Sequence, residues 1–228
     1  MSRVELKVLA ERAGDDLDDA TAVEVLRWAD EQFGSSWAVA SSMADAVVPS
    51  LAACVRPGVD VLFLDTGYHF AETIGTRDAI AATMPVTIRS IEPAQSVAAQ
   101  DVSFGARLYE RNPDQCCALR KVMPLRKTLK GYRAWASGLR RDEASTRAGS
   151  KVVEWDDGRA MVKLNPIAAW TQDDVDQYIA EHGILVNPLL SDGYGSVGCA
   201  PCTRRIQPGE DARAGRWAGS NKVECGLH

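Results

Sequence analysis

Residues Val59 to Gly67 read VDVLFLDTG, and this stretch is the clearest guide to the fold class. Its first six residues are almost all apolar, which is typical of a strand buried on both faces of a sheet. The turn signal Pro57-Gly58 precedes it, and polar residues follow it at once. Strands of this kind occur in sheets that helices cover on both faces. The stretch therefore indicates an α/β fold.

Strand-like and helix-like segments alternate on both sides of this stretch. Apolar runs predict strands at 37–40, 59–64, 86–88 and 134–136, and a hairpin that pairs 151–154 with 160–164. Helical spacing predicts helices at 19–33, 45–55, 70–83, 116–129 and 171–182, with a kink near Pro124. The alternation predicts one α/β domain at 19–205, with a mostly parallel sheet flanked by helices. Residues 1–18 form a polar N-terminal segment, and 206–228 form a C-terminal segment of loop.

The composition limits the classes of function. The formal net charge is −5 and the pI is near 5.3, whereas a general nucleic-acid binder is expected to be basic. No stretch approaches the roughly 18 apolar residues of a membrane helix, and the N-terminus lacks the apolar run of a signal peptide. We therefore expect a cytoplasmic protein with no nucleic-acid or membrane partner. The sequence leaves a homo-oligomer open.

Four of the six cysteines form two close pairs, Cys116-Cys117 and Cys199-x-x-Cys202. In the cytoplasm, thiols are more often ligands or reactive groups than disulfides. Four thiolates are the ligand set of both iron–sulfur clusters and structural zinc. The adjacent pair favours a cluster, because neighbouring thiolates can bind different iron corners. From the residues alone, a zinc site or a lone redox pair stays open.

The other two cysteines differ in their surroundings. Cys225 lies three residues before the C-terminus, where a chain is rarely well ordered unless it docks. A free thiol there is a hazard unless its reactivity is used. Cys225 is therefore either a nucleophile or a harmless unpaired thiol. Cys54 lies in an Ala-rich expected helix and is predicted to be a small buried hydrophobic residue.

Basic residues gather near the cysteine motifs of this acidic chain. Guanidinium groups match the oxygens of phosphate and sulfate. Lys121 follows Cys117 by four residues, which places both on nearly the same helix face. Each cluster alone is an ordinary solvated surface, but together they predict an anion pocket. The arginines concerned are Arg140-Arg141, Arg204-Arg205, Arg213 and Arg216.

Two polar segments directly follow expected strands. They are Ser41-Ser42 and Asp65-Thr66-Gly67. In parallel sheets, ligands bind beyond the carboxyl ends of the strands. These segments are therefore the first candidates for ligand contact.

Taken together, the motifs resemble those of the assimilatory sulfonucleotide reductases, specifically the cluster-containing adenylylsulfate (APS) reductases. The resemblance runs from about Ser36 to His228. The matching motifs are LDTG (64–67), Cys116-Cys117 with Lys121, WASGLRRD (135–142), GCAPCT (198–203), RAGRW (213–217) and ECGLH (224–228).

The resemblance implies a fold similar to the PP-loop adenine-nucleotide hydrolases, with a flexible C-terminal tail. It implies that Cys225 is catalytic and that a [4Fe-4S] cluster is bound by Cys116, Cys117, Cys199 and Cys202. The substrate-binding residues that it implies are Ser41, Ser42, Leu64, Thr66, Lys121, Gly138, Arg140, Arg141, Arg213 and Arg216.

The implied reaction reduces APS to sulfite and AMP. Cys225 forms an S-sulfonate, and reduced thioredoxin then releases sulfite. Two alternatives stay open: a PAPS reductase, and an ATP-dependent thiolation-type enzyme of the PP-loop fold.

One loop departs from the family pattern. The family carries a Ser-Gly-Gly or Ser-Ser-Gly core after the first strand, but here the loop reads SSMAD (41–45). Close backbone approach to a phosphate usually needs glycine. The departure puts the residue assignments in this loop in doubt.

Overall fold

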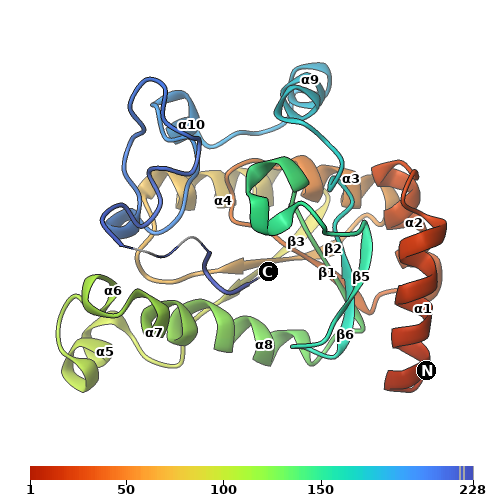
Figure 1. Ribbon diagram of the computed structural model, residues 1–228, viewed down its shortest axis with the longest axis horizontal. Coiled ribbons are helices and arrows are strands. Elements are labelled where there is room, and N and C mark those ends of the chain that lie inside the picture. Colours follow the sequence, from red (N-terminus) through yellow and green to blue (C-terminus); the bar gives the residue numbers. More distant parts are fainter. Residues whose placement is uncertain (221, 223, 228) are drawn as a thin grey trace.

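The computed structural model describes residues 1–220, 222 and 224–227. Within them, six strands form one sheet in the order β3-β2-β1-β4-β6-β5 (Figure 1). Neighbouring strands are parallel except β5, which runs antiparallel to β6. The mostly parallel sheet and the hairpin are therefore confirmed. The strands are β1 (Trp37–Ala40), β2 (Val59–Leu64), β3 (Val86–Ile91), β4 (Ala134–Ser137), β5 (Val153–Asp156) and β6 (Met161–Leu164).

Helices surround this sheet. The α-helices are α1 (Arg3–Asp16), α2 (Ala22–Phe33), α3 (Val47–Val55), α4 (Ala71–Thr83), α5 (Val97–Phe104), α6 (Leu108–Arg111), α7 (Pro113–Cys117), α8 (Met123–Leu129), α9 (Gln172–His182) and α10 (Pro188–Ser191). None of the helices in the described ranges combines the length and apolarity that a bilayer crossing needs.

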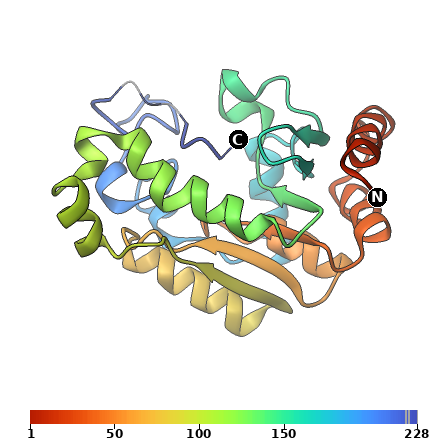
Figure 2. The same ribbon diagram turned by 90° about the horizontal axis from the view of Figure 1, so that it is seen from below.

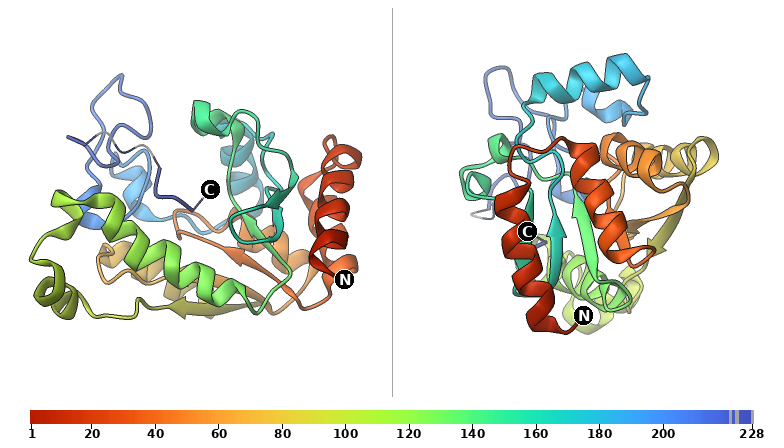
Figure 3. Two further views of the ribbon diagram at one scale, coloured as in Figure 1. Left: turned by 60° about the horizontal axis from the view of Figure 1, so that its bottom comes forward. Right: turned by 90° about the vertical axis from the view of Figure 1, so that its right-hand side faces the viewer.

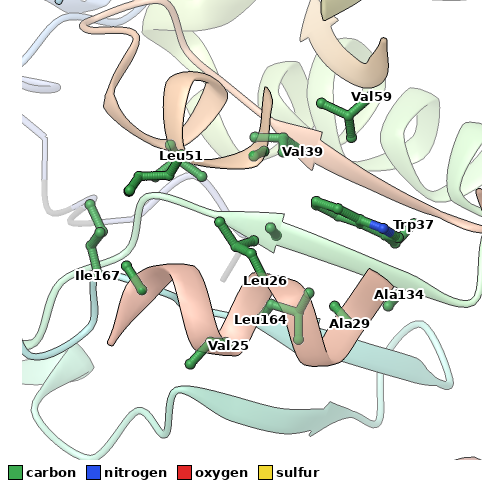
Figure 4. Packing of buried hydrophobic residues seen from close by; sticks show 14 of the residues in the cluster. Val25, Leu26, Ala29, Trp37, Val39, Leu51, Val59, Ala134, Leu164 and Ile167 are labelled. Atoms are coloured by element: carbon green, nitrogen blue, oxygen red, sulfur yellow. The ribbon is translucent and has the colours of Figure 1, made fainter. Parts of the chain in front are cut away.

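The two faces of the sheet carry separate apolar clusters. Val61 and its like-facing neighbours pack against α2, α3 and α4, and Figure 4 shows Trp37 and Val39 in this cluster. Leu62 faces the other way and packs with Leu125 and Leu129 of α8. Figure 2 shows α4 and α8 on opposite faces of the sheet. Burial on both faces explains why β2 is apolar almost throughout.

The strand order places a switch point between β1 and β4. The chain leaves β1 toward β2 on one side, and later returns to lay β4 on the other side. At the carboxyl end, Ala40 of β1 is level with Ser137 of β4. Ser41 and Gly138 therefore leave the sheet next to each other. This is the position at which open α/β sheets bind ligands.

The polar N-terminal segment forms α1, which packs beside the β5–β6 hairpin (Figure 3). Ser2 and Glu5 form a capping box at its start. Gly14 allows the close approach, because a Cβ atom there would lie 2.4 Å from the carbonyl oxygen of Val153. The segment is therefore part of the packed structure.

The expected helix at 116–129 contains an irregular turn. α7 and α8 are joined by a π turn, Ala118–Val122, in which the Met123 N–H donates to the carbonyl of Ala118. Pro124 has no N–H to offer the carbonyl of Arg120, so the regular hydrogen-bond ladder is interrupted there. The helix is thus irregular just before Pro124, where the sequence predicts a kink.

Candidate active site

A cleft of about 930 Å³ opens at the carboxyl ends of β1, β2 and β4. It brings together residues that are far apart in the sequence. The predicted site residues among its lining are Ser41, Ser42, Leu64, Lys121, Gly138, Arg140, Cys199, Arg213, Arg216 and Cys225.

The loop after β1 has no glycine, and Met43 adopts the left-handed backbone conformation instead. Met43 has φ 60°, which is the left-handed conformation that glycine adopts at no steric cost. Its backbone is held on both sides, because its N–H donates to Ser41 Oγ (3.2 Å) and its carbonyl accepts from Asn187 Nδ2 (3.1 Å). Its side chain is fully buried. The loop therefore keeps a tight turn at a strain cost of about 1–3 kcal/mol, which the surrounding contacts must offset.

Asp45 closes this loop. Its carboxylate accepts from the backbone N–H of Val47 (3.0 Å) at the start of α3. Burial raises the pKa of the Asp45 carboxyl, although the Val47 N–H and the charge of Arg140 oppose this shift. Asp45 lines the cleft together with Arg140, whose charge acts on its carboxylate.

The first cysteine pair ends α7. Asn112 caps that helix by accepting from the N–H of Gln115 (3.0 Å), so Cys116 and Cys117 occupy the last turn before the π turn. Both side chains are buried. π turns inside helices frequently occur at functional sites.

The second pair belongs to a 3₁₀ turn, Ala200–Cys202. The turn is held by the backbone N–H of Ala200, which donates to the carbonyl of Tyr68 (2.7 Å). Thr66 Oγ1 lies 3.3 Å from Cys199 Sγ. Thr66 is therefore placed at a cysteine sulfur instead of in the cleft lining.

The two pairs lie close enough to affect each other's charge. Burial raises the pKa of the Cys116 thiol to about 11, and the thiols of Cys117 and Cys199 add to the shift. Burial likewise raises the pKa of Cys202 to about 12, with Cys199 as the next cause. All four are free cysteines. As bare thiols, Cys116, Cys117 and Cys202 resist ionisation, so an ion or cluster that binds thiolates would have to displace their protons.

Lys121 lies between these cysteines and the cleft. Burial lowers the pKa of its ammonium group, but the thiols of Cys199, Cys225 and Cys117 outweigh burial and the net shift is upward. Lys121 therefore stays protonated next to both the cysteine quartet and the tail cysteine. It lines the cleft, so an anion there can also reach it.

Arg216 enters the cleft through a space left by Gly198. A Cβ atom at residue 198 would lie 2.5 Å from the guanidinium carbon of Arg216. The Arg216 Nη1 group donates to Ser196 Oγ (3.1 Å) and to the carbonyl of Val197 (3.2 Å). Its Nε–H is buried and has no hydrogen-bond partner among the described residues. This unsatisfied donor suits an anionic ligand.

The side chains of the adjacent residues Arg140 and Arg141 point in different directions. Arg140 lines the cleft and donates to Gln172 Oε1 (2.8 Å). Arg141 instead donates to Asp18 Oδ1 and to the carbonyl of Ser150, both at 2.8 Å. The structure therefore does not bring Arg141 to the cleft, because Arg140 has extended backbone whereas Arg141 begins the 3₁₀ turn Arg141–Glu143, and the two side chains leave the chain in different directions.

Arg147 lies in the cleft lining and was not anticipated from the sequence. It ends a 3₁₀ turn, Ser145–Arg147, and pairs with Glu143 and Glu224. No motif marks it, because it lies in a polar loop that resembles solvated surface. Its burial is visible only in the folded structure.

The C-terminal tail lies at the cleft, beside Arg147. Cys225 is part of the lining, and Leu227 packs against the cluster that contains Leu125 and Leu129. Figure 3 shows the tail returning toward the middle of the molecule. His228 lies outside the described residues.

Two expectations about the remaining residues have clear outcomes. Cys54 is exposed, so its predicted burial is wrong: it lies on the solvent side of α3. Arg204 forms a two-point pair with Glu210 (2.7 and 2.9 Å), and neither Arg204 nor Arg205 is in the cleft lining.

Comparison with known proteins relates this site to one family. Residues 36–205 match the model of the phosphoadenosine phosphosulfate reductase domain. A protein of Streptomyces coelicolor named adenosine 5′-phosphosulfate reductase is 65% identical over 224 residues, which are 98% of this chain and 95% of that protein. A protein of the same name from Mycolicibacterium smegmatis is 58% identical, over 98% and 95% of the two chains.

Solved structures agree with this relationship. The phosphoadenylyl-sulfate (PAPS) reductase of Candida auris, in complex with phosphate, matches with a TM-score of 0.72 and 27% identity, over 84% of this chain and 94% of that chain. The FMN adenylyltransferase of Candida glabrata matches with a TM-score of 0.55 and 10% identity, over 88% and 74% of the two chains. The second match shows a shared fold alone.

Proposed function

The chain belongs to the phosphoadenosine phosphosulfate reductase family, and from this premise we propose that it reduces adenosine 5′-phosphosulfate to sulfite and AMP in sulfate assimilation. The preference for this substrate over its 3′-phosphorylated form is supported by the names of the relatives that match nearly the whole chain. We place the enzyme in the cytoplasm, which suits its free cysteines.

One observation carries this proposal. Lys121 lines the cleft with Cys199 and Cys225, and its charge is coupled to Cys199, Cys225 and Cys117. The tail thiol and a cation therefore share a cleft large enough for a nucleotide, and cysteines of both pairs lie close to that cation.

We expect the substrate to bind this cleft in one orientation. The adenosine would lie against Ser41, Ser42, Leu64 and Gly138, at the switch point between β1 and β4. The phosphosulfate would then face the cationic end, where Arg216 has an unsatisfied buried donor. The cations that line the cleft are Lys121, Arg140, Arg147, Arg213 and Arg216.

Cys225 acts as the nucleophile in this account. Its thiolate attacks the sulfate sulfur, the bond from sulfur to the bridging oxygen breaks, and AMP leaves with that electron pair. Cys225 becomes an S-sulfonate. Covalent catalysis of this kind divides a hard displacement into two easier steps. The cations stabilise the charge that develops on the departing phosphate.

A reduced thioredoxin supplies the two electrons. One of its thiolates attacks the Cys225 sulfur and sulfite leaves with the electron pair of the S–S bond. The second thioredoxin thiol then resolves the mixed disulfide and restores the Cys225 thiol. Sulfite, AMP and oxidised thioredoxin are the products.

The four cysteines of the two pairs fit a [4Fe-4S] cluster as resident cofactor. Cys116, Cys117, Cys199 and Cys202 would supply four thiol ligands, three of which are buried. The adjacent pair Cys116-Cys117 favours a cluster over a single tetrahedral zinc ion, because neighbouring thiolates can bind different iron corners. Bound there, the cluster would supply negative charge that keeps Lys121 protonated and oriented.

Substitution of the tail cysteine tests the proposed reaction. With reduced thioredoxin, the anaerobically prepared protein should release sulfite and AMP in equal amounts from APS, and should turn over PAPS at least about tenfold less efficiently. Cys225→Ser should lower kcat at least about a thousandfold, because it removes the nucleophile. The matched control is Cys54→Ser, which alters an exposed thiol outside the cleft and should retain full activity.

Two results would refute the proposal. Sulfite release by Cys225→Ser at the wild-type rate would rule out the nucleophile. Release of pyrophosphate from ATP, without turnover of APS, would place the chain with ATP-dependent enzymes of the same fold.

A further inference from the structure

The carboxylate next to Cys225 is held by two arginines. Arg147 Nε and Nη2 donate to the two oxygens of Glu224 at 2.8 and 3.0 Å, and Arg213 Nη2 donates to Oε2 at 3.3 Å. A two-point guanidinium–carboxylate pair is both strong and geometrically specific. The side chains of Arg147 and Glu224 are only 8% and 20% exposed, so solvent screens this pair weakly.

The two arginines come from different segments of the chain. Arg147 ends the turn Ser145–Arg147, which follows β4, whereas Arg213 lies beyond the second cysteine pair. Both line the cleft. Glu224 therefore joins two walls of the cleft through its carboxylate, and fixes the backbone directly before Cys225.

Glu224 carries its negative charge into a cationic setting. Burial alone raises the pKa of its carboxyl, but the hydrogen bonds and charge of Arg147, with the charges of Arg213 and Arg216, lower it overall. Glu224 is thus an anion at neutral pH, placed where the phosphosulfate would bind. The carboxylate of Glu224 thus supplies to these arginines the negative charge that the phosphosulfate would supply when bound.

We propose that Glu224 is a positioning residue, a carboxylate latch that holds the tail across the cleft and competes with the substrate's anionic group for Arg147 and Arg213. The proposal rests on the role of Cys225 as nucleophile. When Cys225 becomes an S-sulfonate, a new anion lies one residue from Glu224. Repulsion between the two weakens the latch, and the tail can then present its sulfur to the reductant.

Alkylation of Cys225 measures the latch directly. The holoenzyme is treated with iodoacetamide without substrate, and modification is followed by mass spectrometry of the tryptic peptide that begins after Lys222, because exposed Cys54 also reacts. Glu224→Gln should raise the rate at Cys225 about tenfold, since it removes a charged hydrogen-bonded partner.

A matched control lies in the same segment. Glu210 holds Arg204 in a similar two-point pair (2.7 and 2.9 Å) but is outside the cleft lining. Glu210→Gln should therefore leave the alkylation rate of Cys225 unchanged. Arg147→Gln should accelerate alkylation as Glu224→Gln does, and the double variant should be no faster than either single one.

The affinity for AMP distinguishes the latch from a purely structural role, because a structural role would leave this affinity unchanged. Glu224→Gln should bind AMP about three- to tenfold more tightly, because the arginines lose their internal competitor. An unchanged alkylation rate, or AMP affinity that is unchanged or weaker, would overturn the latch. The two proposals fail in different experiments. Activity in Cys225→Ser would refute the role of Cys225 as nucleophile, whereas the alkylation rates and AMP affinities test only the contact of Glu224 with the arginines.

Discussion

Gly198 decides where the guanidinium group of Arg216 can lie. A methyl group at residue 198 would come within 2.5 Å of that guanidinium carbon. The atoms in conflict belong to the end of a flexible side chain, so the backbone need not move. Arg216 would instead leave its hydrogen bonds to Ser196 and Val197.

Gly198→Ala should therefore damage binding more than stability. We expect KM for APS to rise about tenfold, as for the loss of a charged hydrogen bond, with little change in Tm. Gly75→Ala is the control, because Gly75 lies in α4 with no atom within 4 Å of the added carbon. It should leave KM unchanged and stabilise the protein by up to about 1 kcal/mol. Steady-state kinetics and thermal unfolding test both, and an unchanged KM in Gly198→Ala would contradict the role of Arg216.

At the residue scale, sequence reasoning works best where a motif fixes side-chain identity and spacing. It selected Lys121 and Arg216, which the fold brings to one cleft. It could not separate Arg140 from Arg141, because the direction of each side chain depends on the local backbone. It missed Arg147, which is buried and pairs with the distant Glu224.

At the scale of elements, the π turn between α7 and α8 links the first cysteine pair to Lys121. It lies directly after Cys117 and contains Lys121 itself. The second pair is held by contacts with the loop after β2, through Thr66 and Tyr68. Two separate elements therefore carry the four thiols, and a cofactor that binds all four would tie them together.

Substitution of one ligand cysteine should remove the cofactor that joins these two elements. Cys202→Ser should lose the broad visible absorption that we expect of the anaerobically purified protein, and should lower Tm by about 10 °C, equivalent to several kcal/mol for a chain of this size. The control, Cys54→Ser, should keep both the colour and the Tm. A colourless wild-type protein that contains zinc would contradict the cluster assignment.

Strands were easier to predict than short helices. The bounds of β1 and β2 match the apolar runs at 37–40 and 59–64, because burial on both faces leaves little choice of residue. β3 extends to Ile91, beyond the predicted 88, through polar Arg89 and Ser90. The helices α5 and α6 were not predicted, since α5 buries little of its surface and α6 has only four residues. For α1, the capping box at Ser2 and Glu5 was the available signal.

At the scale of the whole molecule, the site depends on topology. The switch point between β1 and β4 lies where the cleft opens, and residues of the C-terminal tail complete its lining. Sequence motifs marked both parts, but their distance apart is set by the sheet order. The left-handed Met43 is a further consequence of the fold, because Asn187, far along the chain, holds its carbonyl.

A single turnover with APS, in the absence of thioredoxin, tests the central claim most directly. The measurement is the mass of the tryptic peptide that carries Cys225. We predict a gain equal to one SO₃ group on that peptide, with one AMP released per protein and sulfite released only after reduced thioredoxin is added. AMP and sulfite appearing together without thioredoxin, or the SO₃ group on a peptide without Cys225, would contradict the account.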